Sequence, residues 1–221
     1  MIQSKVIVVD DHPIFRKGLS DILQSDPRIK VIKELSNAKE VLSLHVNDYP
    51  DLFILDLSLQ GGIGGLDLIK SIKQIQPKQN ILVFSMHDEL IYAERSIRAG
   101  ATGYLNKSID FSTLAELVLK ACEGKLVVSE AFKDYLIESQ IFLKPSSQVQ
   151  ENPIQMHLSD RELEIFEKLG EGFKSSDIAE QLFLSVKTVD SHLHHIKQKL
   201  NLETMNQLIV RAAVWVNEQK K

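Results

Sequence analysis

Short apolar runs alternate with helical patterns over the first half of the chain. Five of these runs are candidate strands: Lys5–Val9, Lys30–Lys33, Leu52–Leu55, Ile81–Phe84 and Gly103–Leu105. A stretch with a 3.6-residue apolar period follows each run, and in the first stretch Phe15, Leu19, Ile22 and Leu23 share one face. Strands that are apolar throughout suit a parallel sheet covered by helices on both sides. Five successive βα units therefore predict a doubly wound α/β domain.

The pattern changes after Val128. We expect a short helix at Glu130–Ser139, and residues 144–156 are polar and contain prolines, which is typical of a linker. From residue 158 onward the pattern is helical, and Ser159 and Glu162 form a capping box at the start of the first helix. Helices are expected at about residues 160–170, 175–182, 186–200 and 204–218. The chain thus divides into a domain at 1–128, a linker with a short helix at 129–155 and a helical domain at 156–221.

Composition is ordinary for a globular protein of 221 residues, with 43% hydrophobic and 25% charged residues. Apolar runs reach only four or five residues, which is too short to cross a bilayer, and the N-terminal residues do not resemble a secretory signal. Cys122 is the only cysteine, so a disulfide framework and a cysteine zinc cluster are excluded. We expect a cytoplasmic protein without membrane contact. Its formal net charge of −4 gives no sign of nucleic-acid binding by charge alone.

Polar residues follow the carboxyl ends of the predicted strands. Asp10 and Asp11 close the first strand, Asp56 the third and Ser85 the fourth, and Lys107 follows the fifth. Each residue alone is more often a cap or a turn residue, but ligands of open parallel sheets bind at this edge, and a strand order of 2-1-3-4-5 brings the three carboxylates together. Converging carboxylates suit Mg²⁺. With a lysine and a hydroxyl beside them, they suit phosphoryl transfer to an aspartate.

These residues also carry a resemblance to a known family. The segments VIVVDDHPIFRKGL, LFILDLSL, ILVFSMHDE and AGATGYLNKS are similar to the receiver domain of bacterial two-component response regulators, over residues 3–125. The resemblance implies a flavodoxin-like sheet of order 2-1-3-4-5 and phosphorylation of Asp56 by a sensor histidine kinase. Lys107 would bind the phosphoryl group, Ser85 would be the switch hydroxyl and Tyr104 the aromatic switch. The implied ligands of Mg²⁺ are Asp10, Asp11, Asp56 and the backbone carbonyl of Ser58.

Two features near Asp56 bear on this resemblance. The loop at residues 60–65 contains four glycines and is one residue longer than the Pro-Gly turn that is usual in the family. Ser58 stands two residues after Asp56, where phosphatases of the haloacid-dehalogenase type need a second aspartate as general acid. The hydrolase alternative is therefore excluded, and we expect a regulator rather than an enzyme.

Residues 174–200 predict a helix, a short turn and a longer helix. Ser185 caps the longer helix, whose core stripe consists of Val189, Leu193, Ile196 and Leu200. The opposite face is polar, as in a helix-turn-helix with a recognition face. Two alternatives are an interaction bundle of helices and a metal site, but His192, His194 and His195 would need ligands from another element.

Residues 157–218 resemble the four-helix DNA-binding domain of the NarL/LuxR type. The resemblance implies double-stranded DNA as a partner, with Asp190, Ser191 and His194 on base edges. Candidates for phosphate contact are Lys174, Lys187, Thr188, His195, Lys197 and Lys199. Lys174 stands where a capping serine or threonine is common in the family, and Ser175 is expected to replace it.

Together the two halves predict a transcription factor that forms a homodimer and binds promoter DNA on phosphorylation. Movement of Ser85 is expected to empty space that Tyr104 fills. The final helix offers either a second dimer surface or a core face at Leu208, Ile209, Ala212 and Trp215. The alternatives are a regulator that does not depend on phosphorylation and whose receiver serves only for dimerisation, and a protein that acts by protein contact without sequence-specific DNA binding.

Overall fold

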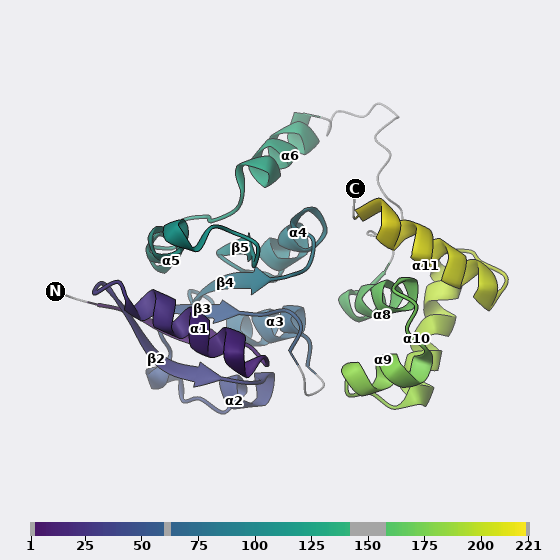
Figure 1. Cartoon of the computed structure of the whole chain (residues 1–221), viewed down its shortest axis with the longest axis horizontal. Helices are drawn as coiled ribbons and strands as arrows, with labels where there is room; N and C mark the ends of the chain where they lie inside the picture. Colours follow the sequence, from purple (N-terminus) through teal and green to yellow (C-terminus); the bar gives the residue numbers. More distant parts are fainter. Residues whose placement is uncertain (1–2, 60–62, 142–157, 220–221) are drawn as a thin grey trace. The chain divides into compact units, whose positions relative to one another are not determined.

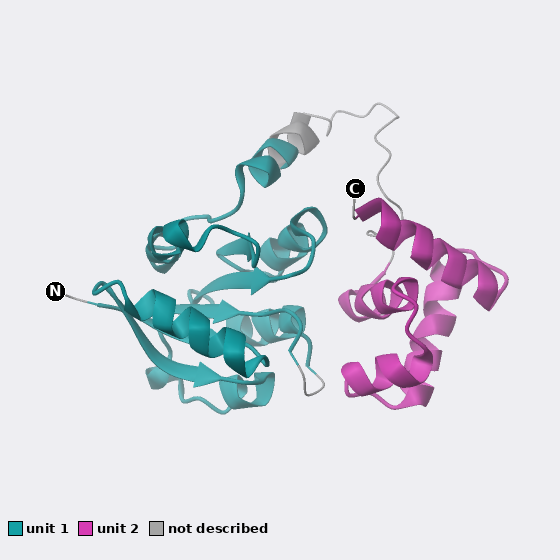
Figure 2. Cartoon of the chain, in the orientation of Figure 1, with its two compact units in different colours: residues 1–144 teal, residues 145–221 magenta. Residues whose placement is uncertain are grey.

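The computed structural model describes residues 3–59, 63–141 and 158–219, and it divides the chain into two units, residues 1–144 and residues 145–221 (Figure 2). The first unit holds a parallel sheet with its helices, and the second holds helices only (Figure 1). These are the two kinds of domain that the hydrophobic pattern predicts.

The first unit is built on a five-stranded parallel sheet with the predicted order β2-β1-β3-β4-β5. Its strands are β1 (Ser4–Val9), β2 (Ile29–Leu35), β3 (Leu52–Leu55), β4 (Asn80–Ser85) and β5 (Gly103–Asn106). β3 has the predicted bounds, and the other four strands are longer than predicted. Val9 of β1 lies opposite Leu55 of β3, so the residues that follow these two strands meet at the carboxyl edge of the sheet.

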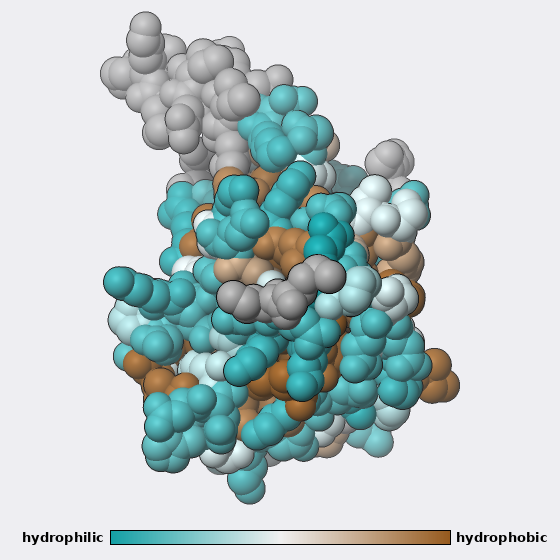
Figure 3. Space-filling model, turned by 90° about the vertical axis from the view of Figure 1, so that its left-hand side faces the viewer, coloured by the Kyte–Doolittle hydropathy of each residue, from teal (hydrophilic) through white to brown (hydrophobic). Residues whose placement is uncertain are grey.

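Helices cover both faces of this sheet, as the uniformly apolar strands require. They are α1 (Pro13–Gln24), α2 (Ala38–Leu42), α3 (Gly65–Ile75), α4 (Glu89–Ala99) and α5 (Leu114–Cys122), with 3₁₀ turns η1 (Val46–Asp48) and η2 (Phe111–Thr113). α1 and α5 contribute side chains to one core layer, and α3 packs between α2 and α4 (Figure 1). The face drawn in Figure 3 is mostly hydrophilic, with hydrophobic residues near its centre and at parts of its edge.

One side chain of α1 departs from the predicted face. Leu19 and Leu23 are buried and Phe15 packs against the core, whereas Ile22 is 39% exposed. Ser20 is fully buried on the inner side of the helix, where the predicted stripe has no member. The buried face of α1 is therefore rotated from the predicted one toward Ser20.

After α5 the chain remains bonded to the edge of the sheet through Val127. Val127 forms a parallel bridge with Gly103, and its carbonyl accepts the N–H of Tyr104 at 2.8 Å. A Cβ atom at residue 103 would collide with the Val127 backbone, so glycine is required there. Helix α6 (Glu130–Ile141) then begins with the Ser129 N–H bound to Glu89 Oε1 at 2.9 Å, and Phe132 is buried. The first turn of the predicted linker helix thus packs on the sheet domain beside α4.

The second unit consists of α8 (Asp160–Gly170), α9 (Ser175–Gln181), α10 (Val186–Lys199) and α11 (Met205–Gln219), close to the predicted bounds. The capping box of Ser159 and Glu162 is present, as predicted. The rings of Phe166 of α8 and Trp215 of α11 are buried and contact each other at a centroid distance of 5.7 Å, tilted by 57°. Among the helices that the structure describes, none combines the length and apolar composition that a membrane span requires.

Candidate functional site

Three carboxylates converge at the carboxyl edge of the sheet. Asp10 and Asp56, which follow the neighbouring strands β1 and β3, are 2% and 3% exposed. One oxygen of each of Asp10, Asp11 and Asp56 and a ring nitrogen of His12 all lie within 4.8 Å of one another. The strand order that was expected from the sequence therefore assembles the acidic group, and it adds His12, which the sequence did not single out.

Lys107 supplies the positive charge of this pocket. Its Nζ donates to Asp10 Oδ2 at 2.7 Å and to Asp56 Oδ2 at 2.8 Å, and its side chain is 5% exposed. Burial alone would lower the pKa of the ammonium, but Asp56 and Asp10 outweigh it, and the pKa of Lys107 is raised. The two buried aspartates thus favour the charged form of Lys107, which lies between them.

The donor set fits a hard divalent cation. Asp56 Oδ1 is buried and accepts no hydrogen bond from the described residues, although Oδ2 of the same carboxylate is bound by Lys107. At Asp11, burial raises the pKa of the carboxyl group, and the charges of Asp56 and Asp10 raise it further, while His12 lowers it in part. One lysine does not balance three carboxylates, and oxygen ligands of this kind are those that Mg²⁺ prefers.

Ser85 and Tyr104 are both fully buried on adjacent strands. The Tyr104 hydroxyl donates to the backbone carbonyl of His87 at 2.8 Å, and burial raises the pKa of the phenol. The ring is buried in this structure, and its expected response to a shift of Ser85 stays a prediction.

His87 is a site residue that the sequence analysis missed. Its Nε2 lies 2.9 Å from Ser58 Oγ, and its backbone carbonyl also accepts from Asn106 Nδ2 at 3.0 Å. The ring contacts that of Tyr92 of α4 at a centroid distance of 4.5 Å, tilted by 33°. The only sequence signal was its place two residues after Ser85, in the loop that follows β4. His87 thus joins the loop after Asp56 to the segment that carries Tyr104.

The glycine-rich loop lies partly outside the described residues, because these resume only at residue 63. Gly65, at the start of α3, is within them. A Cβ atom at residue 65 would lie 2.8 Å from the Asp56 carbonyl oxygen and would also crowd the Leu57 backbone. Glycine at this position therefore lets α3 begin directly against the chain that carries Asp56.

Helix α10 in the second unit has the predicted division into faces. Val189, Leu193 and Ile196 are buried, and the Ser185 side chain caps the helix by accepting the Thr188 N–H at 3.0 Å. The exposed side chains of the helix include Lys187, Asp190, Ser191, His194, His195 and Gln198. α9, the turn and α10 form the arrangement of a helix-turn-helix, with a polar face on the longer helix.

Several of the predicted phosphate-contact residues have partners within the unit. Lys199 Nζ lies 2.6 Å from Glu162 Oε2 of α8, and Lys197 Nζ donates to the Glu203 carbonyl at 3.1 Å. The Thr188 hydroxyl lies 2.7 Å from that of Ser185. By contrast, Lys174 and Lys187 are exposed and make no ion pair with the residues that the structure describes. The lysines at the end of α10 therefore have partners within the unit, whereas the cations at the beginnings of α9 and α10 face solvent.

The start of α9 differs from the prediction. Lys174 itself occupies the N-cap position, and the carboxylate of Asp177 accepts its backbone N–H at 3.3 Å. Ser175 is the first residue of the helix and does not replace a capping side chain. The Lys174 side chain is thus left free to point into solvent beside a helix N-terminus.

Comparisons with known proteins agree with this geometry. The family described as response regulator receiver domain matches residues 6–119, and the family described as bacterial regulatory proteins, luxR family, matches residues 156–212. A nitrate/nitrite response regulator protein homolog of Haemophilus influenzae is 31% identical over 98% of this chain and 98% of that protein. The oxygen regulatory protein NreC of Staphylococcus haemolyticus is 33% identical over 93% of this chain and 94% of that protein.

The fold of the whole chain is similar to a solved structure. The RcsB response regulator of Salmonella typhimurium matches it with a TM-score of 0.68 at 24% identity, over 97% of this chain and 98% of that chain. A sheet of this order with an acidic pocket, followed by a helix-turn-helix unit, defines a two-component transcription regulator. The chain belongs to the response regulator family, with a receiver domain followed by a DNA-binding domain of the LuxR type. Receiver domains bind Mg²⁺ at an acidic pocket of this kind.

Proposed function

We propose that the protein accepts a phosphoryl group on Asp56 from a sensor histidine kinase, and that this promotes dimerisation and binding to promoter DNA. The observation that carries the proposal is the asymmetry of the Asp56 carboxylate. Oδ2 is bound by Lys107, while Oδ1 is buried without a donor among the described residues. A carboxylate with one oxygen fixed and the other unpaired suits a nucleophile.

The transfer moves the phosphoryl group from a kinase histidine to Asp56. An Asp56 oxygen forms a bond to phosphorus while the bond between phosphorus and the kinase imidazole breaks, and that ring leaves with its electron pair. Lys107 is placed to bind a phosphoryl oxygen, because its ammonium already touches Asp56. Asp10, Asp11, Asp56 and the Ser58 backbone carbonyl would hold Mg²⁺, which would supply further positive charge for the phosphoryl oxygens.

The effect of phosphorylation is then transmitted to β5, the edge strand of the sheet. Ser85 supplies a hydroxyl for the phosphoryl group, and the bond of Tyr104 to the His87 carbonyl couples the loop after β4 to β5. The N–H of Tyr104 in turn binds Val127, and Glu89 of α4 binds Ser129. A change in packing of α4 and β5 is therefore transmitted to the start of the linker, residues 129–155.

Binding to DNA uses the exposed face of α10. Asp190, Ser191 and His194 face base edges in the major groove, and the Asp190 carboxylate suits a cytosine amino group. Lys174, Lys187 and His195 contact phosphates of the DNA backbone. The Thr188 hydroxyl is a further candidate for phosphate contact. Lys197 and Lys199 contribute mainly through the fold, because their ammonium groups are bound internally. A dimer places two such helices on two half-sites.

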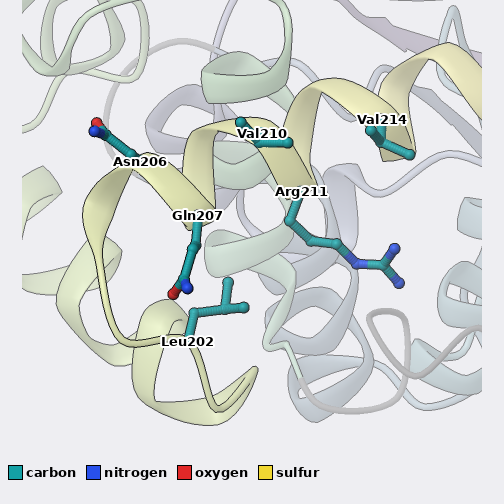
Figure 4. Close-up of a pocket in the computed structure, with 6 residues that line it drawn as sticks. All are labelled: Leu202, Asn206, Gln207, Val210, Arg211 and Val214. Atoms are coloured by element: carbon teal, nitrogen blue, oxygen red, sulfur yellow. The ribbon is translucent and has the colours of Figure 1, made fainter.

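The final helix supplies a dimer surface beside its core face, and of the two alternatives for the residues singled out in the sequence the core face holds for three. Leu208, Ala212 and Trp215 are buried in the core, whereas Ile209 is 42% exposed. Beside it an apolar groove of about 550 Å³ runs along α11 (Figure 4). The residues that line the groove are Leu202, Asn206, Gln207, Val210, Arg211 and Val214. Its exposed valines suit contact with the same surface of a second copy.

A regulator that works without phosphorylation is the second candidate. The observation that favours it is the buried ring of Tyr104, whose hydroxyl is bound to the His87 carbonyl. The two candidates differ in what Asp56 does. Incubation with a small phosphodonor and Mg²⁺, followed by intact-mass measurement, will show one added phosphoryl group in the natural protein and none in Asp56→Asn. No added mass in either treated protein would support the second candidate.

A further inference from the structure

The Lys107 ammonium has a third partner besides the two carboxylates. An ammonium has three N–H groups, and two of them donate to Asp10 and Asp56. The Phe15 ring lies on a further side, with its centroid 4.3 Å from Lys107 Nζ. This distance is within the range of about 6 Å over which an aromatic face attracts a cation, and the attraction is stronger where water is excluded. The lysine side chain is nearly inaccessible, so the contact belongs to the stronger kind.

The ring itself is held by a row of aromatic contacts. Phe15 packs on Phe84 at 5.8 Å and 43°, and Phe84 packs edge-to-face on Phe111 at 6.2 Å and 82°. Phe84 directly precedes Ser85, and Phe111 begins the turn that follows the Lys107 loop. The position of the ring is therefore fixed by three elements that surround the pocket. The helical period of α1 assigned Phe15 only to the core face, and the structure gives it this second contact.

An aromatic face differs from other possible partners of a buried ammonium. A third carboxylate would repel an incoming phosphoryl group, and water would bring solvent into the pocket. The ring attracts the ammonium through its quadrupole and leaves the positive charge available. It is also the partner whose charge stays the same when the Asp56 carboxylate becomes an acyl phosphate.

We propose that Phe15 is a positioning residue for phosphorylation, which holds the Lys107 ammonium beside Asp56 so that it meets the incoming phosphoryl oxygen. The inference rests on the proposed phosphorylation of Asp56. Helix α1 would thus contribute to the chemistry of the pocket through the aromatic face of Phe15.

The test changes the electron density of the ring and keeps its shape. Phenylalanines with one, two or three ring fluorines replace Phe15 in the full-length protein, and the rate of phosphorylation by phosphoramidate with Mg²⁺ is measured. Fluorine weakens the attraction of the face for a cation. We expect the rate to fall stepwise, by about tenfold over the series. The melting temperature stays within the range that the control series shows. Phe15→Leu is slowed at least as much, and Phe15→Tyr, which keeps an aromatic face, retains most of the rate.

The matched control is the same fluorine series at Phe111, which belongs to the aromatic row but has no ammonium over its face among the described residues. The rate is expected to stay constant in that series. A constant rate in the Phe15 series, or equal losses at Phe15 and Phe111, would overturn the inference while leaving phosphorylation of Asp56 established. A natural protein that takes up no phosphoryl group would overturn the proposed function, and the inference with it.

Discussion

Lys107 and Asp56 are 51 residues apart in the chain and 2.8 Å apart between Nζ and Oδ2. The contact exists because β3 and β5 both end at the carboxyl edge of the sheet, on either side of β4. It places a buried cation on the residue that we propose as phosphoryl acceptor. The same ammonium binds Asp10, so one side chain balances part of the charge of the whole acidic pocket.

Replacing this cation is expected to destabilise the first unit. Lys107→Met leaves Asp10 and Asp56 buried without their counter-charge, and we expect the free energy of unfolding to fall by about 3 kcal/mol. Urea unfolding followed by circular dichroism measures the change. Lys17→Met is the matched control, because Lys17 forms an exposed ion pair with Asp21 and should matter little. Equal stability of Lys107→Met and the natural protein would contradict the assignment of a charge-balancing role.

Removal and addition of Mg²⁺ should change the stability of the same unit. Binding to the folded protein alone stabilises it by about 2.7 kcal/mol at a free concentration one hundred times the dissociation constant. We therefore expect the melting temperature to rise with Mg²⁺ and to return after treatment with a chelator. In Asp11→Asn the rise should be much smaller, whereas Asp51→Asn, at the opposite edge of the sheet, should respond like the natural protein. An identical rise in both variants would place the metal elsewhere.

The ion pair between Glu162 and Lys199 predicts a pH dependence for the second unit. Burial tends to raise the pKa of Glu162, but Lys199 and Ser159 outweigh burial and lower the pKa below 4.5. A lowered pKa in the folded state means that the stabilisation is complete above the unfolded pKa and is lost as the pH falls through the folded value.

Trp215, the single tryptophan, lies in this unit and reports its unfolding by fluorescence. At neutral pH, Glu162→Gln should cost about 2 kcal/mol of unfolding free energy, since a charged hydrogen-bond partner is lost. This difference from the natural protein should shrink at acid pH. Glu171→Gln, which removes a more exposed pair with Lys168, is the control and should show little change. A difference that stays constant from neutral to acid pH would contradict the assignment.

Lys187 and Lys199 should have separate effects on DNA binding. Lys187 is exposed near the start of α10, so Lys187→Ala should weaken binding and reduce the slope of log affinity against log salt by about 1. Lys199→Ala should lower the stability of the second unit and leave the salt slope nearly unchanged, because its ammonium binds Glu162. Fluorescence anisotropy with labelled promoter DNA at several salt concentrations gives both slopes. Equal slope changes would show that the internal ion pair opens on DNA.

The acidic pocket was predictable because it depends on topology. Apolar strands indicated a parallel sheet, and the carboxyl ends of parallel strands meet at one edge. The strand order therefore suffices to bring Asp10, Asp56 and Lys107 together. His87 was missed because its contact with Ser58 depends on the paths of two loops, which periodicity does not describe. For a similar reason the helical period placed Phe15 in the core but gave no sign of the lysine above it.

In the second unit, the sequence predicted which side chains of a helix are buried, but not which side chains on different helices pair. The core stripe of α10 followed from its period, and Val189, Leu193 and Ile196 are buried. The period could not show that Lys199 reaches back to Glu162 on another helix. On α11 the period identified Leu208, Ala212 and Trp215, which are three of the four buried residues of the helix. It also included Ile209, which is 42% exposed.

We propose above that a phosphoryl group on Asp56 changes the assembly of the protein from monomer to dimer. Size-exclusion chromatography with light scattering, with and without Mg²⁺ and beryllofluoride as a phosphoryl mimic, tests it most directly. We expect a monomer that becomes a dimer with the mimic, and no change in Asp56→Asn. A mass that stays the same with the mimic, or a dimer already present without it, would contradict assembly driven by phosphorylation.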